Sequence, residues 1–542
     1  MKIYITKNLK HILLVSLMAM LSSVSAAMLP YITAEFIEHI EGLDAGNIGK
    51  YAGGFVLSVV GILIFEYFSK VFSAALMKRI MFQLKRDVVK KTLCMPANEY
   101  YKNDTNYYIS IITEDIRNLY GDYFECIFDF VLSIIRIVVY SAFMFYLNTI
   151  LAVVVLMCSV FSIFIPKLVG KKLSDLREKQ AEENSRYIGV VKEIFGAFSL
   201  VNKHTRNAIS NRHEEAGKKR EGITFTYNKY RSFVEIFAGL SLYIINIATF
   251  VVGIIMIAKE MLTVGDFVAI ISFIDLVAIP IRDMIYQFIG IKSANGLKDK
   301  LVNILKIDAD EDKESIDSCN SIDIKNLNYN IEDFSLKGIN LHFEKGKKYA
   351  IVGKSGAGKS TLFKLLLGQI TDYSGNILID GKNIRNYQVS DVFADIGQRP
   401  VMFDASAEDN ITLFGSYNSK NLKDYIHGLD AEYLMRENCG EEGSNLSGGE
   451  RNKIALLRAL NRECEVLLCD EMFSALDRKN REDIADYIFS QKNRTVISIT
   501  HDVSKAALSK YDEIIIIDAG KIVKSGLTKE MIAEVDGYFS GK

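Results

Sequence analysis

Six long apolar stretches in the first 300 residues constrain the fold of this 542-residue chain more than any other feature. A helix needs about 20 mostly apolar residues to cross the hydrocarbon core of a bilayer, and each stretch reaches or approaches that length. Residues 320–542 contain no such stretch, and their short apolar runs are typical of buried strands. The six stretches lie at roughly 11–32, 52–76, 126–147, 149–168, 236–258 and 264–287.

The chain therefore divides into two unlike halves, which an acidic stretch at 308–317 separates. After this stretch, short strands alternate with helices, which is the pattern of an α/β domain with a largely parallel sheet. We expect a multi-domain membrane protein: an all-α six-helix transmembrane domain with long cytoplasmic helical extensions over 1–305, a linker over 306–320 and the α/β domain over 321–542.

Composition excludes several other classes of protein. The chain has 65 basic and 66 acidic residues, so no net charge attracts it to nucleic acid. Its seven cysteines are odd in number and include no CxxC pair, which argues against a disulfide scaffold and against a structural zinc site. Because there is no tryptophan, tyrosines have to serve as anchors at the membrane interface.

The distribution of lysine and arginine predicts the orientation in the membrane. The loop at 33–50 has four acidic residues and one lysine and should face outside, whereas the basic segments 78–122 and 167–231 should face the cytoplasm. Both termini and the α/β domain are then cytoplasmic. The first stretch also resembles a cleaved signal peptide, but it continues through Ile32 and five more stretches follow, which favours a retained helix.

Ionisable residues inside predicted spans are candidates for function. Arg136 and Asp275 fall near the middle of their spans, and Asp129 lies seven residues before Arg136 on a similar helix face. These side chains could line a water-filled substrate cavity, or they could form structural ion pairs between helices. Both interpretations remain open at this point.

A glycine-rich loop in the second half has the spacing of a phosphate-binding loop. A short apolar run at 349–352 leads into it and an apolar helix follows, which is the context that the motif G-x-x-x-x-G-K-[ST] requires. Lys359 is expected to reach the β- and γ-phosphates of ATP, and Ser360 is expected to hold Mg²⁺. The predicted ATP-binding residues are Gly353, Lys354, Ser355, Gly356, Ala357, Gly358, Lys359, Ser360 and Thr361.

Further candidates follow other strands and helices. Asp470 and Glu471 end an apolar run, where a parallel sheet delivers side chains to a ligand crevice. Asp470 suits Mg²⁺ coordination, Glu471 suits polarising the attacking water, and His501 could contact the γ-phosphate. A small-residue segment before another helix predicts a second phosphate site, which invites a sandwich of two protomers. Its residues, expected to act in trans, are Ser447, Gly448, Gly449 and Glu450.

Together these elements resemble the nucleotide-binding domain of an ATP-binding cassette (ABC) transporter. The loop at 353–361 resembles Walker A, Asp470 and Glu471 resemble Walker B, and 446–450 resembles the signature LSGGQ with Glu450 in place of glutamine. The resemblance assigns further roles to the D-loop at 474–477, to the switch histidine His501, to the exporter X-loop at 440–443 and to Gln398. Gln398 resembles the Q-loop glutamine that links the nucleotide state to the membrane domain, and we expect it at the catalytic site and near Mg²⁺.

The membrane half resembles the six-helix exporter domain of the same family, on the residues at 113–115 and 262–266 and on Pro280. This resemblance implies coupling helices near 113–118 and 203–207. The sequence departs from the family at the aromatic residue that stacks on adenine: Ile331 occupies that place, with Tyr329 and Phe334 nearby, and we expect Tyr329 to make the contact. The interval from Asn410 to Leu446 is also shorter than usual.

The expected function is ATP-driven export of a peptide, a lipid or a hydrophobic small molecule across the cytoplasmic membrane, by alternating access in a dimer. The second half-transporter subunit could be another copy or a different chain. Alternatives are an importer of a metal chelate with the same fold and an ATP-dependent membrane sensor, although Glu471 and His501 favour turnover. An abundance of Lys, Ile, Asn and Tyr fits an AT-rich bacterial gene, and the start of the first span near residue 11 leaves no room for an N-terminal protease domain.

Overall fold

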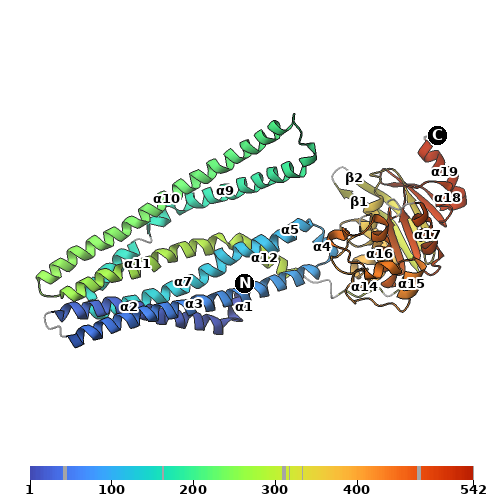
Figure 1. The fold of residues 1–542 in the computed structure, drawn as a ribbon. Helices are drawn as coiled ribbons and strands as arrows, with labels where there is room; N and C mark the ends of the chain where they lie inside the picture. The colour runs from blue at the N-terminus through green and yellow to red at the C-terminus, as the bar shows by residue number, and fades with distance from the viewer. Residues whose placement is uncertain are drawn as a thin grey trace. The chain divides into compact units, whose positions relative to one another are not determined.

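The computed structural model of the chain consists of two compact units, drawn in Figure 1. The first comprises Met1–Lys90 and Asn106–Lys306, and the second comprises Lys91–Thr105 and Ile307–Lys542. The D-loop predicted at 474–477 and much of the acidic stretch at 308–317 lie outside the described residues. The structure describes residues 1–40, 45–161, 164–307, 313–316, 318–331, 334–398, 400–472 and 478–540.

The described part of the membrane half is mostly helical, and the described residues of each of the six predicted stretches lie in helices. A nearly continuous helical run extends from residue 105 to 147, and α9 and α10 form a long antiparallel hairpin (Figure 1). The helices are α1 (Lys2–Thr6), α2 (Leu9–Glu38), α3 (Ala45–Leu93), α4 (Ala97–Tyr100), α5 (Thr105–Ser110), η2 (Ile111–Asp115), α6 (Ile116–Leu119), η3 (Tyr120–Glu125), α7 (Cys126–Leu147), α8 (Thr149–Phe161), α9 (Phe164–Gly196), η4 (Phe198–Leu200), α10 (Arg206–Ala258), α11 (Val264–Ser293) and α12 (Asn295–Lys306).

Four helical segments of the described chain are long and apolar enough to cross a membrane: Leu9–Glu38, Ile48–Leu93, Thr105–Leu147 and Val264–Ser293. At the other two predicted spans, the apolar helical segments are shorter, Thr149–Ser159 and Leu242–Ala258. Side chains at several positions next to these two segments lie outside the described residues, so the lengths refer only to the described part.

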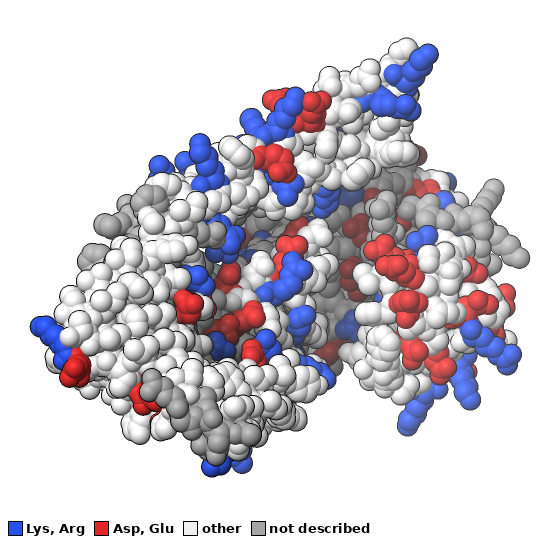
Figure 2. All heavy atoms as spheres, turned by 60° about the vertical axis from the view of Figure 1, so that its left-hand side comes forward, with Lys and Arg blue, Asp and Glu red and all other residues white. Residues whose placement is uncertain are grey.

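Packing and exposure in this unit are those expected of helices in lipid. The buried core takes side chains from α2, α7, α8, α10 and α11, among them Ala27, Met144 and Phe273. Gly265 lets α11 approach α2 closely, because a Cβ there would lie 2.5 Å from the carbonyl oxygen of Ala34. The middle of α3 instead exposes apolar side chains, including Val56, Leu57, Leu63 and Tyr67. Figure 2 shows the broad uncharged surface of the described membrane helices.

The turn after α3 differs from the expectation for the first coupling helix. Residues 113–118 lie inside the helical run from 105 to 147, not in a connection. The chain turns at 94–104 instead, around the short helix α4, which Pro96 precedes as its N-cap residue. The second predicted position, 203–207, lies at the turn between α9 and α10, next to η4.

The second unit is built on two sheets. The larger has the order β10-β9-β3-β8-β7-β6 and is parallel except for the β9–β10 pair, and the smaller, β2-β1-β4-β5, is antiparallel. The strands are β1 (Ser321–Ile331), β2 (Phe334–Glu344), β3 (Lys348–Val352), β4 (Ser374–Ile379), β5 (Lys382–Asn383), β6 (Phe393–Ile396), β7 (Val466–Asp470), β8 (Thr495–Ile499), β9 (Glu513–Asp518) and β10 (Lys521–Leu527).

Helices cover both faces of the larger sheet, so its central strands are buried on both sides. In β3, Tyr349 and Ile351 face one core cluster, whereas Ala350 and Val352 face another. The helical elements are α13 (Lys359–Leu366), η6 (Ile384–Asn386), α14 (Ala407–Thr412), α15 (Leu422–Gly428), η7 (Glu432–Arg436), η8 (Glu441–Gly443), α16 (Gly448–Asn461), α17 (Arg478–Ser490), α18 (Lys505–Leu508) and α19 (Thr528–Ser540).

Candidate functional site

The phosphate-binding loop connects β3 to α13, as the strand–loop–helix pattern predicts. The ammonium of Lys359 donates hydrogen bonds to the carbonyl oxygens of Gly353 (2.8 Å) and Lys354 (2.9 Å), which holds it at the centre of the loop. Burial lowers the pKa of this ammonium, although Glu471 and Asp470 act against that shift. A partly desolvated cation beside converging backbone N–H groups is a strong site for a phosphate anion.

Gly358 is required by the shape of the loop. Its φ is +103°, a left-handed conformation that glycine adopts without strain. A Cβ at this position would lie 2.6 Å from Cζ of Phe334 and 2.7 Å from Cδ2 of Leu336. The loop therefore packs directly against strand β2.

The three predicted catalytic side chains lie together. Glu471 follows β7 with a positive φ of 52°, and its backbone N–H donates to the carbonyl oxygen of Ile499 (3.1 Å). Its carboxylate lies 2.7 Å from Nε2 of His501 and accepts a hydrogen bond from Nε2 of Gln398 (2.9 Å). Three segments that are far apart in the sequence thus orient one carboxylate.

Asp470 and Ser360, two of the predicted Mg²⁺ ligands, also meet. Burial raises the pKa of the Asp470 carboxyl, and a hydrogen bond with the Ser360 hydroxyl opposes this shift. Hydroxyl and carboxylate oxygens are the ligands that Mg²⁺ prefers. The donor set therefore fits this ion. The third predicted ligand, Gln398, donates its amide N–H to Glu471.

A cavity of about 440 Å³ opens beside the phosphate loop. Ile331 and Phe334 line it, whereas Tyr329 is not among its lining residues and packs against the core of the unit. The structure therefore does not favour Tyr329 over its neighbours for an adenine contact, although Tyr329 and Ile331, two residues apart in β1, lie on the same side of the strand. The remaining lining residues are Ser355, Gly356, Ala357, Gly358, Lys359, Ser360, Thr361, Glu471 and His501.

The signature-like segment begins α16 with a capping box. Ser447 accepts from the N–H of Glu450 (3.3 Å), and the Glu450 carboxylate accepts from the N–H of Ser447 (2.8 Å). Glutamate performs this capping role as well as glutamine does. Residues 447–450 are not among the lining residues of the phosphate-loop cavity, so the described chain does not bring its own two phosphate sites together.

The sequence interpretation missed a half-buried arginine on this helix. Arg458 donates to the carbonyl oxygens of Asn410 (2.7 Å) and Val401 (2.8 Å) and to Oδ1 of Asn410 (3.1 Å). It thereby fastens α16 to the segment that follows Gln398. Its position on the inner face of an amphipathic helix was the only available signal.

Of the three predicted cavity residues, the structure brings two together. Arg136 and Asp129 lie on α7, and Asp129 interacts electrostatically with Arg136 and with Asp283 of α11. Asp275 lies on an exposed face of α11, and no ion pair of the described residues joins it to the other two. These charged side chains could line a substrate cavity or form structural ion pairs between helices, and both interpretations stay open.

Comparisons with known proteins agree with this architecture. The model of the ABC transporter transmembrane region matches residues 12–280, and the model described as ABC transporter matches residues 336–474. The ATP-dependent lipid A-core flippase of Yersinia pestis is 24% identical over 521 residues, covering 89% of this chain and 87% of the relative. The flippase of Haemophilus influenzae is 25% identical over 512 residues, with coverages of 89% and 86%.

A solved structure has the same fold over its full length. A bacterial Atm1-family ABC exporter with ATP bound superposes with a TM-score of 0.85 at 19% identity, and the match covers 99% of each chain. Three observations lead to one conclusion. The two family models match the chain in the family's order, the predicted catalytic side chains lie together, and the relatives span most of the chain. The chain belongs to the ABC transporter family and joins a transmembrane region to the ATPase domain that drives it.

Proposed function

We propose that two copies of this chain form an exporter that uses ATP to move a lipid-like amphiphile from the cytoplasmic side of a bacterial plasma membrane. The observation that carries the proposal is the assembled group of Glu471, His501 and Gln398 beside the phosphate loop of a chain that also carries the membrane helices. The names of the flippase relatives support a lipid-like cargo, and the exporter with the same fold supports outward movement.

In the proposed reaction, Lys359 binds the β- and γ-phosphates and Glu471 orients the attacking water. His501 and Gln398 hold the Glu471 carboxylate in place, and His501 is close enough to the loop cavity to contact the γ-phosphate. Ser360 and Asp470, with Gln398, are the residues that would hold Mg²⁺. Mg²⁺ bound there would neutralise developing charge on the phosphates.

The second half of each ATP site comes from the partner copy. Ser447, Gly448, Gly449 and Glu450 would contact the γ-phosphate held by the partner's phosphate loop, where the N-terminus of α16 supplies positive potential. ATP then binds the closed pair better than the open pair, which is the condition for ATP to change the conformation. We place both termini and the ATPase domain in the cytoplasm, with domains over 1–305 and 321–542 joined by a linker over 306–320.

Two exposed apolar surfaces support pairing of the copies. The tip of the α9–α10 hairpin exposes Phe195, Phe198 and Leu200, and the ATPase unit exposes Val401, Phe403 and Phe414. The rings of Phe403 and Phe414 pack edge to face with centroids 5.3 Å apart. The hairpin tip of one copy would cover this patch on its partner and so couple ATP binding to the membrane helices.

A cross-linking experiment tests this pairing. With Phe198→Cys and Phe403→Cys in one chain, mild oxidation should yield a disulfide-linked dimer, because the two positions face each other across the copies. As a control, Phe225→Cys replaces Phe198→Cys at another exposed phenylalanine, on α10, and should yield little dimer. A dimer band of equal strength in the control pair contradicts the docking, as does the absence of dimer in the test pair.

We also assign the adenine contact to Phe334 rather than to Tyr329. Because the chain has no tryptophan, Phe334→Trp creates a single fluorescent reporter at the cavity edge. ATP should quench its emission as adenine stacks on the indole, and Tyr329→Trp, at a position outside the cavity lining, should respond much less. A larger change in emission for Tyr329→Trp than for Phe334→Trp would assign the adenine contact to Tyr329.

The two alternative functions predict different behaviour. An importer of metal chelates would be stimulated by chelate and not by amphiphiles, and none of the relatives named above is described as an importer. A sensor would bind ATP without sustained turnover, which the assembled Glu471 site disfavours. The test is ATPase activity in liposomes with phospholipids, lipopolysaccharide, peptides and metal chelates added in turn. Stimulation by a lipid class supports the proposal, and stimulation by chelate or peptide alone overturns the cargo assignment.

A further inference from the structure

The chain that leaves the sixth span enters the ATPase unit along the edge of the larger sheet. Ile316 is buried, and its backbone N–H donates to the carbonyl oxygen of Gln388 (3.4 Å), while the N–H of Gln388 donates to the carbonyl oxygen of Glu314 (3.0 Å). Residues 314–316 are thus fastened to the segment that leads into β6.

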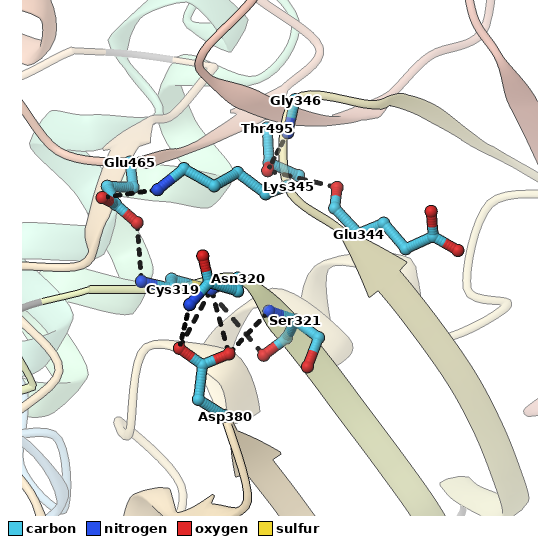
Figure 3. A network of polar contacts seen from close by, with 9 residues as sticks. All are labelled: Cys319, Asn320, Ser321, Glu344, Lys345, Gly346, Asp380, Glu465 and Thr495. Carbon is cyan, nitrogen blue, oxygen red and sulfur yellow. Dashed lines mark hydrogen bonds and ion pairs between the residues drawn. The ribbon is translucent and has the colours of Figure 1, made fainter.

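The next contact fastens the chain to β7. The backbone N–H of Cys319 donates to one carboxylate oxygen of Glu465 (2.6 Å), and the ammonium of Lys345 pairs with the other (2.9 Å). Figure 3 shows Glu465 between these two partners. Cys319 is almost fully buried, so the contact with Glu465 belongs to the packed interior of the unit.

A second carboxylate holds the following two residues. Asp380 accepts from the backbone N–H groups of Asn320 (3.0 Å) and Ser321 (2.8 Å), as Figure 3 shows. Asp380 belongs to the turn after β4 in the smaller sheet. It fixes the start of β1 but has no part in the strands that carry catalytic residues, which makes it a matched control for Glu465.

Strands β6 and β7 are adjacent, parallel and in register, with Phe393 opposite Val466. Their amino ends follow Gln388 and Glu465, where the entering chain is fastened. Their carboxyl ends lead to Gln398 and to Asp470 with Glu471. Five residues of strand span about 16 Å, and a hydrogen-bonded strand pair moves as one body, so a displacement at one end reaches the other.

We propose that Glu465 is a positioning residue that couples the sixth span to the catalytic acids: its carboxylate fixes the entering chain at Cys319 to the amino end of β7, and movement of the span shifts Asp470 and Glu471 through that strand. This route is separate from the docking of the hairpin tip described above. It rests on the proposed function only in requiring that ATP turnover and movement of the membrane helices are linked.

The test uses the full chain in liposomes of phosphatidylethanolamine and phosphatidylglycerol. Two quantities are measured: ATP hydrolysis with its KM, and the ATP-dependent change in hydrogen exchange of the membrane helices. Glu465→Ala should leave kcat and KM within about twofold of normal, since Glu465 touches neither ATP nor its ligands. The ATP-dependent change in exchange of the sixth span should fall by more than half.

Conservative variants separate positioning from structural support. Glu465→Gln keeps an oxygen acceptor for the Cys319 N–H and Lys345→Met leaves the carboxylate in place, so both should keep most of the exchange response. Asp380→Asn should also keep it. If Glu465→Ala does not fold, Glu465→Ser, whose hydroxyl is too short to reach Cys319, replaces it.

A preserved exchange response in Glu465→Ala, or in Glu465→Ser where that variant replaces it, overturns the proposal. So does a parallel loss of ATPase activity and response, which would assign Glu465 a purely structural role. Failure of the unchanged chain to show any ATP-dependent response would instead contradict the proposed function, and the two failures are therefore distinguishable.

Discussion

Glu471→Gln should reduce ATP hydrolysis to less than about a hundredth of the normal rate, because a positioned general base contributes about 10²–10⁴-fold. The Glu471 carboxylate lies between His501 and Gln398 and ends the strand that delivers Asp470. Glutamine preserves the size of this side chain and one of its two oxygen acceptors but cannot polarise water as a carboxylate does. ATP binding should therefore remain, and the ATP-bound pair should accumulate in the closed state.

The measurement is the rate of phosphate release from liposomes together with binding of a fluorescent ATP analogue. Glu463→Gln is the matched control, since Glu463 lies just before β7 and its carboxylate accepts a hydrogen bond from Ser419 on the surface of the unit. Normal turnover in Glu471→Gln would remove the mechanism. Loss of binding along with turnover would show that the substitution damages the site as a whole.

Lys359→Met should abolish ATP binding at working concentrations. Residue Lys359 is 6% exposed, and its ammonium donates hydrogen bonds to two carbonyl oxygens at the centre of the loop. Removing one partner of a buried charge-assisted contact costs at least about 2 kcal/mol, which is a loss of affinity of at least about thirtyfold. Methionine matches the length of the side chain, so the effect reports the charge and not a cavity.

Lys354→Met supplies the control within the same loop. Lys354 belongs to the predicted loop but is not among the residues that line the cavity, and its ammonium lies 5.6 Å from the ring of Tyr538, so removing this ammonium should change ATP affinity only slightly. Titration of both variants with ATP, followed by the emission of Phe334→Trp, measures the two affinities in one format. Equal losses of ATP affinity in Lys354→Met and Lys359→Met would contradict the assigned role of Lys359.

Much of this fold could be predicted because hydrophobic length and periodicity report local structure directly. The apolar stretches lie within helices, and the run at 349–352 is part of β3 next to its loop. The loop, the acidic pair and His501 were predictable as a site, since each motif stands at a fixed place after a strand. Their convergence on Glu471 needed the register of the parallel strands.

Other features depend on which way a side chain points, which sequence spacing does not specify. Tyr329 and Phe334 lie five residues apart around a hairpin, and only the fold shows that Phe334 packs on Gly358 and lines the cavity. The first coupling helix was misplaced because its position at 113–118 was inferred from the family resemblance, whereas Pro96 is the local signal for the turn at 94–104. The contact of Glu465 with Cys319 joins residues 146 positions apart and leaves no local pattern.

The central claim is that ATP hydrolysis by this chain drives outward movement of a lipid-like cargo. The most direct measurement uses liposomes that contain a fluorescent phospholipid and the transporter, with ATP added outside to reach molecules whose ATPase domain faces outward. The account predicts that ATP and Mg²⁺ reduce the fraction of fluorescent lipid that external dithionite can bleach, and that Glu471→Gln prevents this change. An unchanged bleachable fraction during sustained ATP hydrolysis, or a change of equal size in Glu471→Gln, would contradict it.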